Sequence, residues 1–270
     1  MQDRKKSRVL LLIGNKLWNW NTVNTFKKST LNIVGVCVYN NNFFGFPIKY
    51  LFKSIKKRGI IAVIDQILGR LLYKIINLYS DRRRLNEIFN LEDCKYIKKN
   101  LEIPSYFTHS YNDKKTIEWI SKLNPNVVVV HTEGWVGKEI RSISQIELII
   151  GGHPGLTPTY RGSHSPFWAI YNKEEKKVGY SIFHIDGGVD TGDLIFQKEI
   201  NISNKKDSYI SLGWKGMKEI ARKQVEIIEE YEKTQKISRT KHHNISDASE
   251  YPIPGLSHYV RYLYIQNKVK

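Results

Sequence analysis

Short apolar runs alternate with amphipathic segments along much of this chain. Four runs predict buried strands, at Arg8–Gly14, Leu31–Tyr39, Val127–Val130 and Ile146–Ile150. Helical patterns lie between the later strands, most clearly at Asp113–Leu123. Strands that alternate with helices are typical of an α/β fold, here a Rossmann-like, doubly wound and mostly parallel sheet with helices on both faces. Ligands of such sheets bind beyond the carboxyl ends of the strands.

Two longer helical patterns complete the expected architecture. Ile60–Tyr79 is apolar with basic flanks, and we interpret it as a packing helix; a contact with a second copy of the chain or with a membrane surface is the alternative. Tyr209–Lys233 carries one apolar stripe and predicts another helix. We expect a catalytic domain over residues 1–203, with a helical insertion at about 53–95. A C-terminal helix and short irregular extension would fill 204–270.

The amino-acid composition excludes few classes of function. The chain has 43 Lys and Arg against 26 Asp and Glu, a net charge of +17, which favours anionic partners without choosing among phosphorylated substrates, nucleic acid and membranes. Its two cysteines, Cys37 and Cys94, show no metal-ligand spacing, so we expect no metal. We find no signal peptide or transmembrane pattern and expect a cytoplasmic protein. Gly14-Asn15-Lys16 follows the first strand without G-x-G-x-x-G, which argues against dinucleotide binding.

The candidate chemistry lies between Gly151 and Gln197. His153 follows the fourth predicted strand, and Asp190 lies in a glycine-rich turn. A histidine and an aspartate at two such loop positions can act as an acid–base pair if the fold brings them together.

Two motifs in this segment resemble those of the N10-formyltetrahydrofolate-dependent formyltransferase family. They are HPGLTPTYRG at 153–162 and DGGVDTGD at 186–193, and the resemblance is strong over about residues 100–200. It implies that His153 and Asp190 are catalytic and that N10-formyltetrahydrofolate is the formyl donor. It also implies two donor-binding segments, whose residues are His131, Thr132, Glu133, Gly134, Trp135, Val136, Ile185, Asp186, Gly187 and Gly188. Whether Trp135 packs on the donor or in the core stays open.

One position departs from the family pattern. The family has a catalytic Asn two residues before the histidine, and this chain has Gly151, followed by Gly152. Loss of one oxyanion donor typically lowers the rate by about 10² to 10³. A backbone N–H of the two glycines, or a side chain such as His164 or Asn15, can replace the amide; otherwise the protein is a slow, altered or inactive relative.

The resemblance leaves the amine acceptor open. The chain after Gln197 is too short for the C-terminal barrel of methionyl-tRNA formyltransferase, so a tRNA acceptor is disfavoured. We expect transfer to a small primary amine, best a nucleotide-linked amino sugar. Glycinamide ribonucleotide or methionyl-tRNA as acceptor, hydrolysis of the donor, and a degenerate folate-binding relative are the alternatives. A homodimer is compatible with the sequence.

Overall fold

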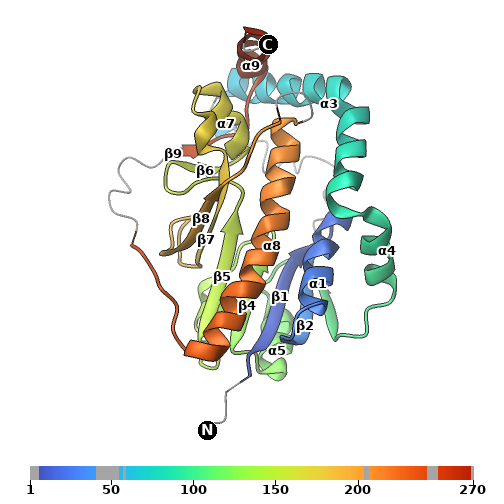
Figure 1. The fold of residues 1–270 in the computed structure, drawn as a ribbon, viewed down its shortest axis with the longest axis vertical. Coiled ribbons are helices and arrows are strands. Elements are labelled where there is room, and N and C mark those ends of the chain that lie inside the picture. Colours follow the sequence, from blue (N-terminus) through green and yellow to red (C-terminus); the bar gives the residue numbers. More distant parts are fainter. Residues whose placement is uncertain (1–5, 41–54, 57–58, 204–206, 242–248, 269–270) are drawn as a thin grey trace.

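The computed structural model describes residues 6–40, 55–56, 59–203, 207–241 and 249–268, and it is built on one seven-stranded sheet (Figure 1). The strand order is β3-β2-β1-β4-β5-β7-β8. The bounds are β1 (Arg8–Gly14), β2 (Asn32–Tyr39), β3 (Ser105–Thr108), β4 (Val127–His131), β5 (Leu148–His153), β7 (Gly179–His184) and β8 (Leu194–Glu199). The strands from β3 to β5 pair in parallel, while β7 and β8 pair antiparallel at the edge. The predicted mostly parallel sheet is confirmed.

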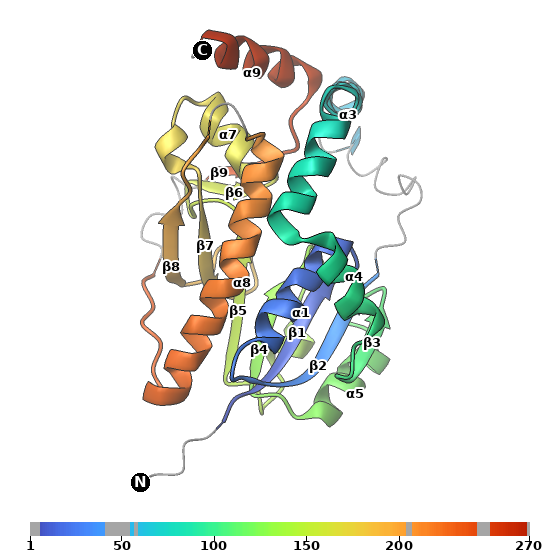
Figure 2. The same ribbon diagram turned by 45° about the vertical axis from the view of Figure 1, so that its right-hand side comes forward.

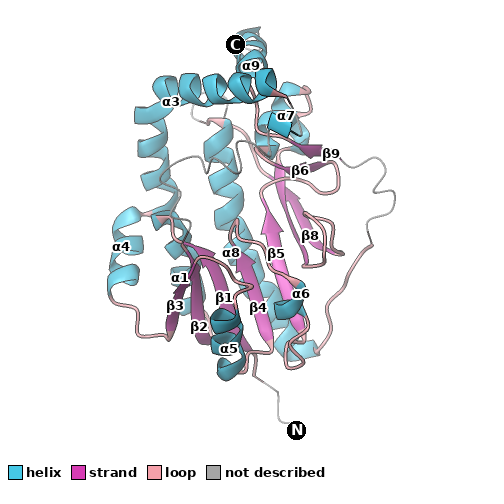
Figure 3. Ribbon diagram, turned by 180° about the vertical axis from the view of Figure 1, so that it is seen from behind, coloured by secondary structure: helices cyan, strands magenta, loops and turns pink. Residues whose placement is uncertain are grey.

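Helices cover both faces of this sheet, as Figures 2 and 3 show from two sides. Alternate residues of β1 explain why, because Leu11 is buried on one face and Leu12 on the other. The helices of the first face are α1 (Trp20–Lys27), α4 (Leu91–Lys99) and α8 (Tyr209–Thr234). Those of the second face are α5 (Lys114–Leu123) and α6 (Lys138–Arg141). The described residues also contain two single-turn 3₁₀ segments, Leu17–Asn19 and Glu175–Lys177.

The C-terminal chain returns to the neighbourhood of the sheet. The short strand β9 (Ser249–Tyr251) pairs in parallel with β6 (Tyr160–Gly162), and α7 (Ser165–Tyr171) and α9 (Leu256–Lys268) pack beside them. Val225 and Ile228 of α8 belong to the same core cluster as β1. The predicted division between residues 1–203 and 204–270 stays a prediction.

The helix predicted at Ile60–Tyr79 is longer in the structure. It is α3 (Ile60–Phe89), because the charged segment after Tyr79 still places Leu85 and Ile88 against the core. The helix ends where Asn90 adopts a left-handed conformation. It runs across one end of the molecule and then turns along its side (Figure 1). Of its predicted basic flank, Lys53, Lys57 and Arg58 lie outside the described residues.

Candidate active site

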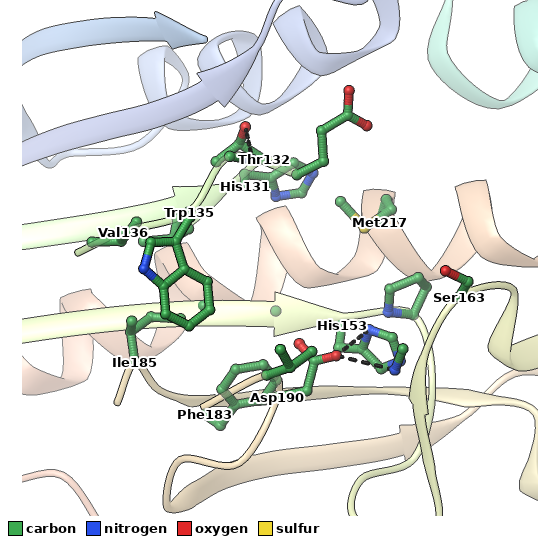
Figure 4. Close-up of a pocket in the computed structure, with 18 of the residues that line it drawn as sticks. His131, Thr132, Trp135, Val136, His153, Ser163, Phe183, Ile185, Asp190 and Met217 are labelled. Atoms are coloured by element: carbon green, nitrogen blue, oxygen red, sulfur yellow. Dashed lines mark hydrogen bonds and ion pairs between the residues drawn. The ribbon is translucent and has the colours of Figure 1, made fainter. Parts of the chain in front are cut away.

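A cavity of about 530 Å³ opens at the carboxyl ends of β4 and β5. Its walls come from these strand ends, from the loop after β7, from the turn after β6 and from residues 250–253. This is where a parallel α/β sheet binds ligands, because the strand ends leave the backbone and the following loops open to solvent. His153 and Asp190 both line it, so the fold brings the two candidate catalytic residues together (Figure 4).

His153 is held by contacts at both ring nitrogens. Its Nε2 lies 3.0 Å from the carbonyl oxygen of Tyr160 and 2.7 Å from the hydroxyl of Ser165. Because a carbonyl only accepts, Nε2 carries a proton and donates it. Nδ1 lies 3.3 Å from Oδ2 of Asp190, which leaves a site for one further proton between imidazole and carboxylate. His153 is only 7% exposed, whereas the side chain of Asp190 is 21% exposed, so the imidazole is buried and the carboxylate reaches the cavity.

The glycine-rich turn aims Asp190 at this ring. Asp190 has a φ of 53°, a left-handed conformation that is costly for a non-glycine residue. Its Oδ2 also accepts a hydrogen bond of 3.3 Å from the N–H of Gly162. Arg161 donates to the carbonyl oxygen of Val189 at 2.9 Å and so holds the turn. The backbone strain is therefore offset by contacts that fix the carboxylate beside His153.

Asp186 has a different place in the same turn. Its Oδ1 accepts from the N–H of Gly188 at 2.9 Å and from the hydroxyl of Thr191 at 2.7 Å. These bonds close the turn around its own carboxylate. At Gly192, a Cβ would overlap the carbonyl oxygen of His184, so only glycine fits there.

The predicted donor-binding residues surround the other end of the cavity. All of them line it except Gly187, which lies outside the lining. Trp135 is 52% exposed and extends over the cavity (Figure 4), so its alternative interpretation as an ordinary core residue is wrong. Glu133 forms an exposed ion pair of 2.9 Å with Lys16, and His131 is 2% exposed.

The space beside Gly151 is already filled. A Cβ at Gly151 would overlap the side chain of Ile185, and one at Gly152 would overlap Ile220. Both glycines are paired within the sheet: Gly151 pairs with β4 and with β7, and Gly152 pairs with β7. Glycine therefore lets Ile185 and Ile220 pack directly on the strand.

Neither side chain named as a substitute for the missing amide lies in the cavity. Asn15 donates to Asn40 and accepts from Lys98, and His164 packs against the ring of Tyr209. Polar side chains that sequence reasoning missed do line the cavity, and they include Asn19, Ser163 and Glu250. A signal for Asn19 existed, since it follows the first strand closely.

Two histidines with desolvated rings, the buried His131 and the partly exposed His164, make stability depend on pH. Burial lowers the pKa of His131 to about 4. Burial, and then the charge of Arg70, lowers the pKa of His164 to about 4. In the unfolded chain, histidines take up a proton near pH 6.5, whereas these two stay neutral in the folded protein down to about pH 4. Their contribution to the free energy of unfolding is therefore complete above pH 6.5 and is lost as the pH falls toward 4.

We expect the free energy of unfolding to fall between pH 6.5 and 4, by about 3 kcal/mol per histidine. Denaturant titrations at several pH values measure it. His164→Asn, which tolerates the left-handed backbone at φ 58°, should remove part of the slope. An unchanged slope would show that His164 does not cause it.

Comparisons with known proteins agree with this architecture. The family model described as formyl transferase matches residues 59–219, more than half of the chain. The methionyl-tRNA formyltransferase of Clostridioides difficile strain 630 is 36% identical over 127 residues, which are 44% of this chain and 40% of that protein. The chain thus matches less than half the length of this relative.

Two solved structures share the fold. A candidate sugar N-formyltransferase of Mycobacterium tuberculosis has a TM-score of 0.53 and 14% identity, covering 96% of this chain and 87% of that one. The phosphoribosylglycinamide formyltransferase of Anaplasma phagocytophilum has a TM-score of 0.53 and 16% identity, covering 89% and 98%. At these identities the likeness concerns the fold.

Proposed function

This chain belongs to the formyl transferase family, and we propose on that premise that it transfers a formyl group from N10-formyltetrahydrofolate to a primary amine. The observation that carries the proposal is the pair of His153 and Asp190, 3.3 Å apart in the wall of one cavity. Such a pair can hold and move a proton beside a reacting carbonyl.

The donor end of the cavity suits a flat heterocycle. Trp135 offers an exposed ring face, and the loop at Asp186 and Gly188 brings backbone groups to the cavity wall. A pterin has a stacking face and an edge of hydrogen-bond donors and acceptors, which such surroundings can bind. The donor supplies an activated formyl group. The protein binds and orients the donor, and its side chains accept and donate the protons that the reaction moves.

In the proposed reaction, the acceptor nitrogen forms a bond to the formyl carbon, and the bond from that carbon to the donor nitrogen breaks. Protonated His153 stabilises the negative charge that develops on the formyl oxygen. Asp190 holds the imidazolium and accepts a proton from the amine, directly or through water, and that proton is returned to the donor nitrogen as its bond to the formyl carbon breaks. The hydroxyl of Ser163, a residue that lines the same cavity as His153, is our candidate for the donor that replaces the missing amide.

The charge of the cavity favours an amino sugar as acceptor. Among the described residues, its lining includes four carboxylates and neither lysine nor arginine; the acids are Glu133, Asp186, Asp190 and Glu250. A phosphate inside this cavity would meet like charge, whereas hydroxyl groups and an amine would find acceptors. We therefore place the hydroxylated amine beside His153 and any phosphates of a nucleotide outside the cavity.

Glu250 is our candidate for acceptor recognition. Glu250 belongs to β9, which two hydrogen bonds hold to the segment after β6. The N–H of Ser163 donates to the carbonyl oxygen of Tyr251 at 2.9 Å, and Nε1 of Trp168 donates to the carbonyl oxygen of Pro252 at 2.9 Å. The Glu250 side chain is exposed at the cavity wall. A carboxylate there can accept hydrogen bonds from sugar hydroxyls or from the amine.

We expect Glu250→Gln to raise KM for the amino-sugar acceptor about tenfold, the effect of losing one charge-assisted hydrogen bond. The KM of the formyl donor and kcat should change little. Steady-state kinetics with each substrate varied in turn measure this. Glu199→Gln, an exposed position on β8, is the matched control. An unchanged acceptor KM would contradict the assignment of Glu250.

The proposed function itself is tested with N10-formyltetrahydrofolate, alone and with a panel of nucleotide-linked amino sugars. Tetrahydrofolate release and a product mass gain of one formyl group are the expected results. Release without any amine would identify a hydrolase. A tRNA acceptor would instead show binding that falls steeply with salt. No release under any of these conditions would refute transfer to this class.

A further inference from the structure

Apolar side chains gather on the outer faces of α3 and α9. Eleven of the fifteen large hydrophobic side chains that are exposed among the described residues belong to these two helices. They are Ile60, Ile61, Ile64, Leu68, Leu71, Ile75, Ile76, Tyr79, Val260, Leu263 and Tyr264. A concentration of exposed apolar side chains on two neighbouring helices indicates an interaction site, because single exposed hydrophobic residues are normally scattered.

Over residues 61–71 of α3 and over α9, the spacing of these residues puts them on one side of the helix. On α3, Ile61, Ile64, Leu68 and Leu71 recur at intervals of three and four, which is one helical face. On α9, Val260, Leu263 and Tyr264 do the same. We call these residues of both helices, with the others listed above, the α3–α9 surface.

The opposite faces hold the two helices to each other and to the body. Tyr73 of α3 packs against Tyr259 of α9 with ring centroids 5.8 Å apart, and Asp65 accepts from the backbone N–H of Ser257 at 3.1 Å. Both helices lie at the same end of the molecule (Figures 1 and 2). The apolar stripes therefore belong to elements that are fixed side by side.

The charges around this surface are predominantly positive. Exposed cationic side chains on or beside the two helices are Lys56, Arg70, Lys74, Arg82, Arg83 and Arg261. The acidic residues of α3 are engaged: Asp65 with Ser257, Asp81 with Arg84 at 3.1 Å, and Glu87 with Arg83 at 3.6 Å. The sequence of α9 contains no acidic residue. An apolar face with cations at its border is the pattern of helices that lie in a membrane interface.

We propose that the α3–α9 surface binds the surface of a membrane that contains anionic lipids. The apolar side chains would enter the boundary of headgroups and acyl chains, and the cations would contact the lipid phosphates. A second copy of the chain fits less well, because two such surfaces would bring like charges together. Among the described residues, no helix is long and apolar enough to cross a membrane, so binding is peripheral. The proposal is independent of the formyl-transfer function.

Co-sedimentation with lipid vesicles tests this surface. We expect the full chain to sediment with vesicles of about 70% phosphatidylcholine and 30% phosphatidylglycerol, and far less with phosphatidylcholine alone. Ile61→Gln, Ile64→Gln and Leu68→Gln together should lower the bound fraction about tenfold through lost apolar burial. Tyr96→Gln is the matched control, an exposed aromatic residue of α4 that is 68% exposed and outside the α3–α9 surface.

A second variant keeps the test valid if the triple substitution impairs folding. Lys74→Glu with Arg82→Glu changes only exposed cations, and it should remove the preference for phosphatidylglycerol. Equal binding to both vesicle types by the wild type, or none to either, would overturn the proposal. So would a stable dimer in sedimentation velocity that the triple variant converts to monomer, since a second copy would then cover the surface.

Discussion

His153→Ala is expected to lower kcat/KM for formyl transfer at least about 10³-fold, since general acid–base groups contribute about 10² to 10⁴ and this residue also stabilises the oxyanion. Its contacts support this role, because Asp190 lies 3.3 Å from Nδ1 while Tyr160 and Ser165 fix the other nitrogen. Asp190→Asn keeps the shape of the turn and removes the proton acceptor, so we expect a loss of similar size. Steady-state assays with the formyl donor and the amino-sugar panel measure both.

Asp193→Asn is the matched control for charge in the same motif, because Asp193 does not line the cavity. Thermal unfolding of each variant separates loss of activity from loss of fold. Removing two members of one catalytic unit is not additive, so the double variant should be about as slow as either single one. Transfer by His153→Ala within about tenfold of wild type would overturn the catalytic assignment.

Gly151→Asn is expected to lower transfer by about tenfold to a hundredfold, although it introduces the residue found at this position in the family. A Cβ here would overlap Ile185, and the strand is paired on both sides, so the side chain cannot enter without displacing its neighbour. Overpacking of this kind typically costs about 1–3 kcal/mol. Assay of kcat/KM together with the midpoint of thermal unfolding measures both consequences.

The double variant Gly151→Asn with Ile185→Ala separates two explanations for the glycine. If packing alone causes the loss, removing the Ile185 side chain should restore the melting temperature and much of the activity. Ile185→Ala by itself is the control for the cavity that this truncation creates. A large gain in rate from Gly151→Asn alone would instead indicate a site that has lost its amide donor, and would contradict our interpretation.

The elements were predictable where burial produces a strong local pattern. The strand at Arg8–Gly14 matches its prediction, because a strand buried on both faces is a continuous apolar run. The fourth predicted strand begins later and extends to His153, since Gly151 and Gly152 continue the sheet without an apolar side chain to signal it. The strand β9 was not predicted, because it is only three residues long and is defined by its pairing with β6.

The family resemblance was confirmed. Its motifs contain His153, which ends β5, and Asp190, which lies in the turn between β7 and β8. Sequence could not show which polar residues complete the cavity. Glu250 and Ser163 come from segments far apart in the chain, and they meet only because β9 pairs with β6. Nor could it show that Ile185 fills the space beside Gly151.

By itself, the sequence determined the α/β sheet and the family of this chain, because apolar periodicity and contiguous motifs are local properties. The tertiary structure alone decided the 3.3 Å pairing of His153 with Asp190, the acidic lining of the cavity and the exposed stripes of α3 and α9. These depend on which distant segments pack together. Exposure, distance and charge of neighbours are set by that packing rather than by the order of residues.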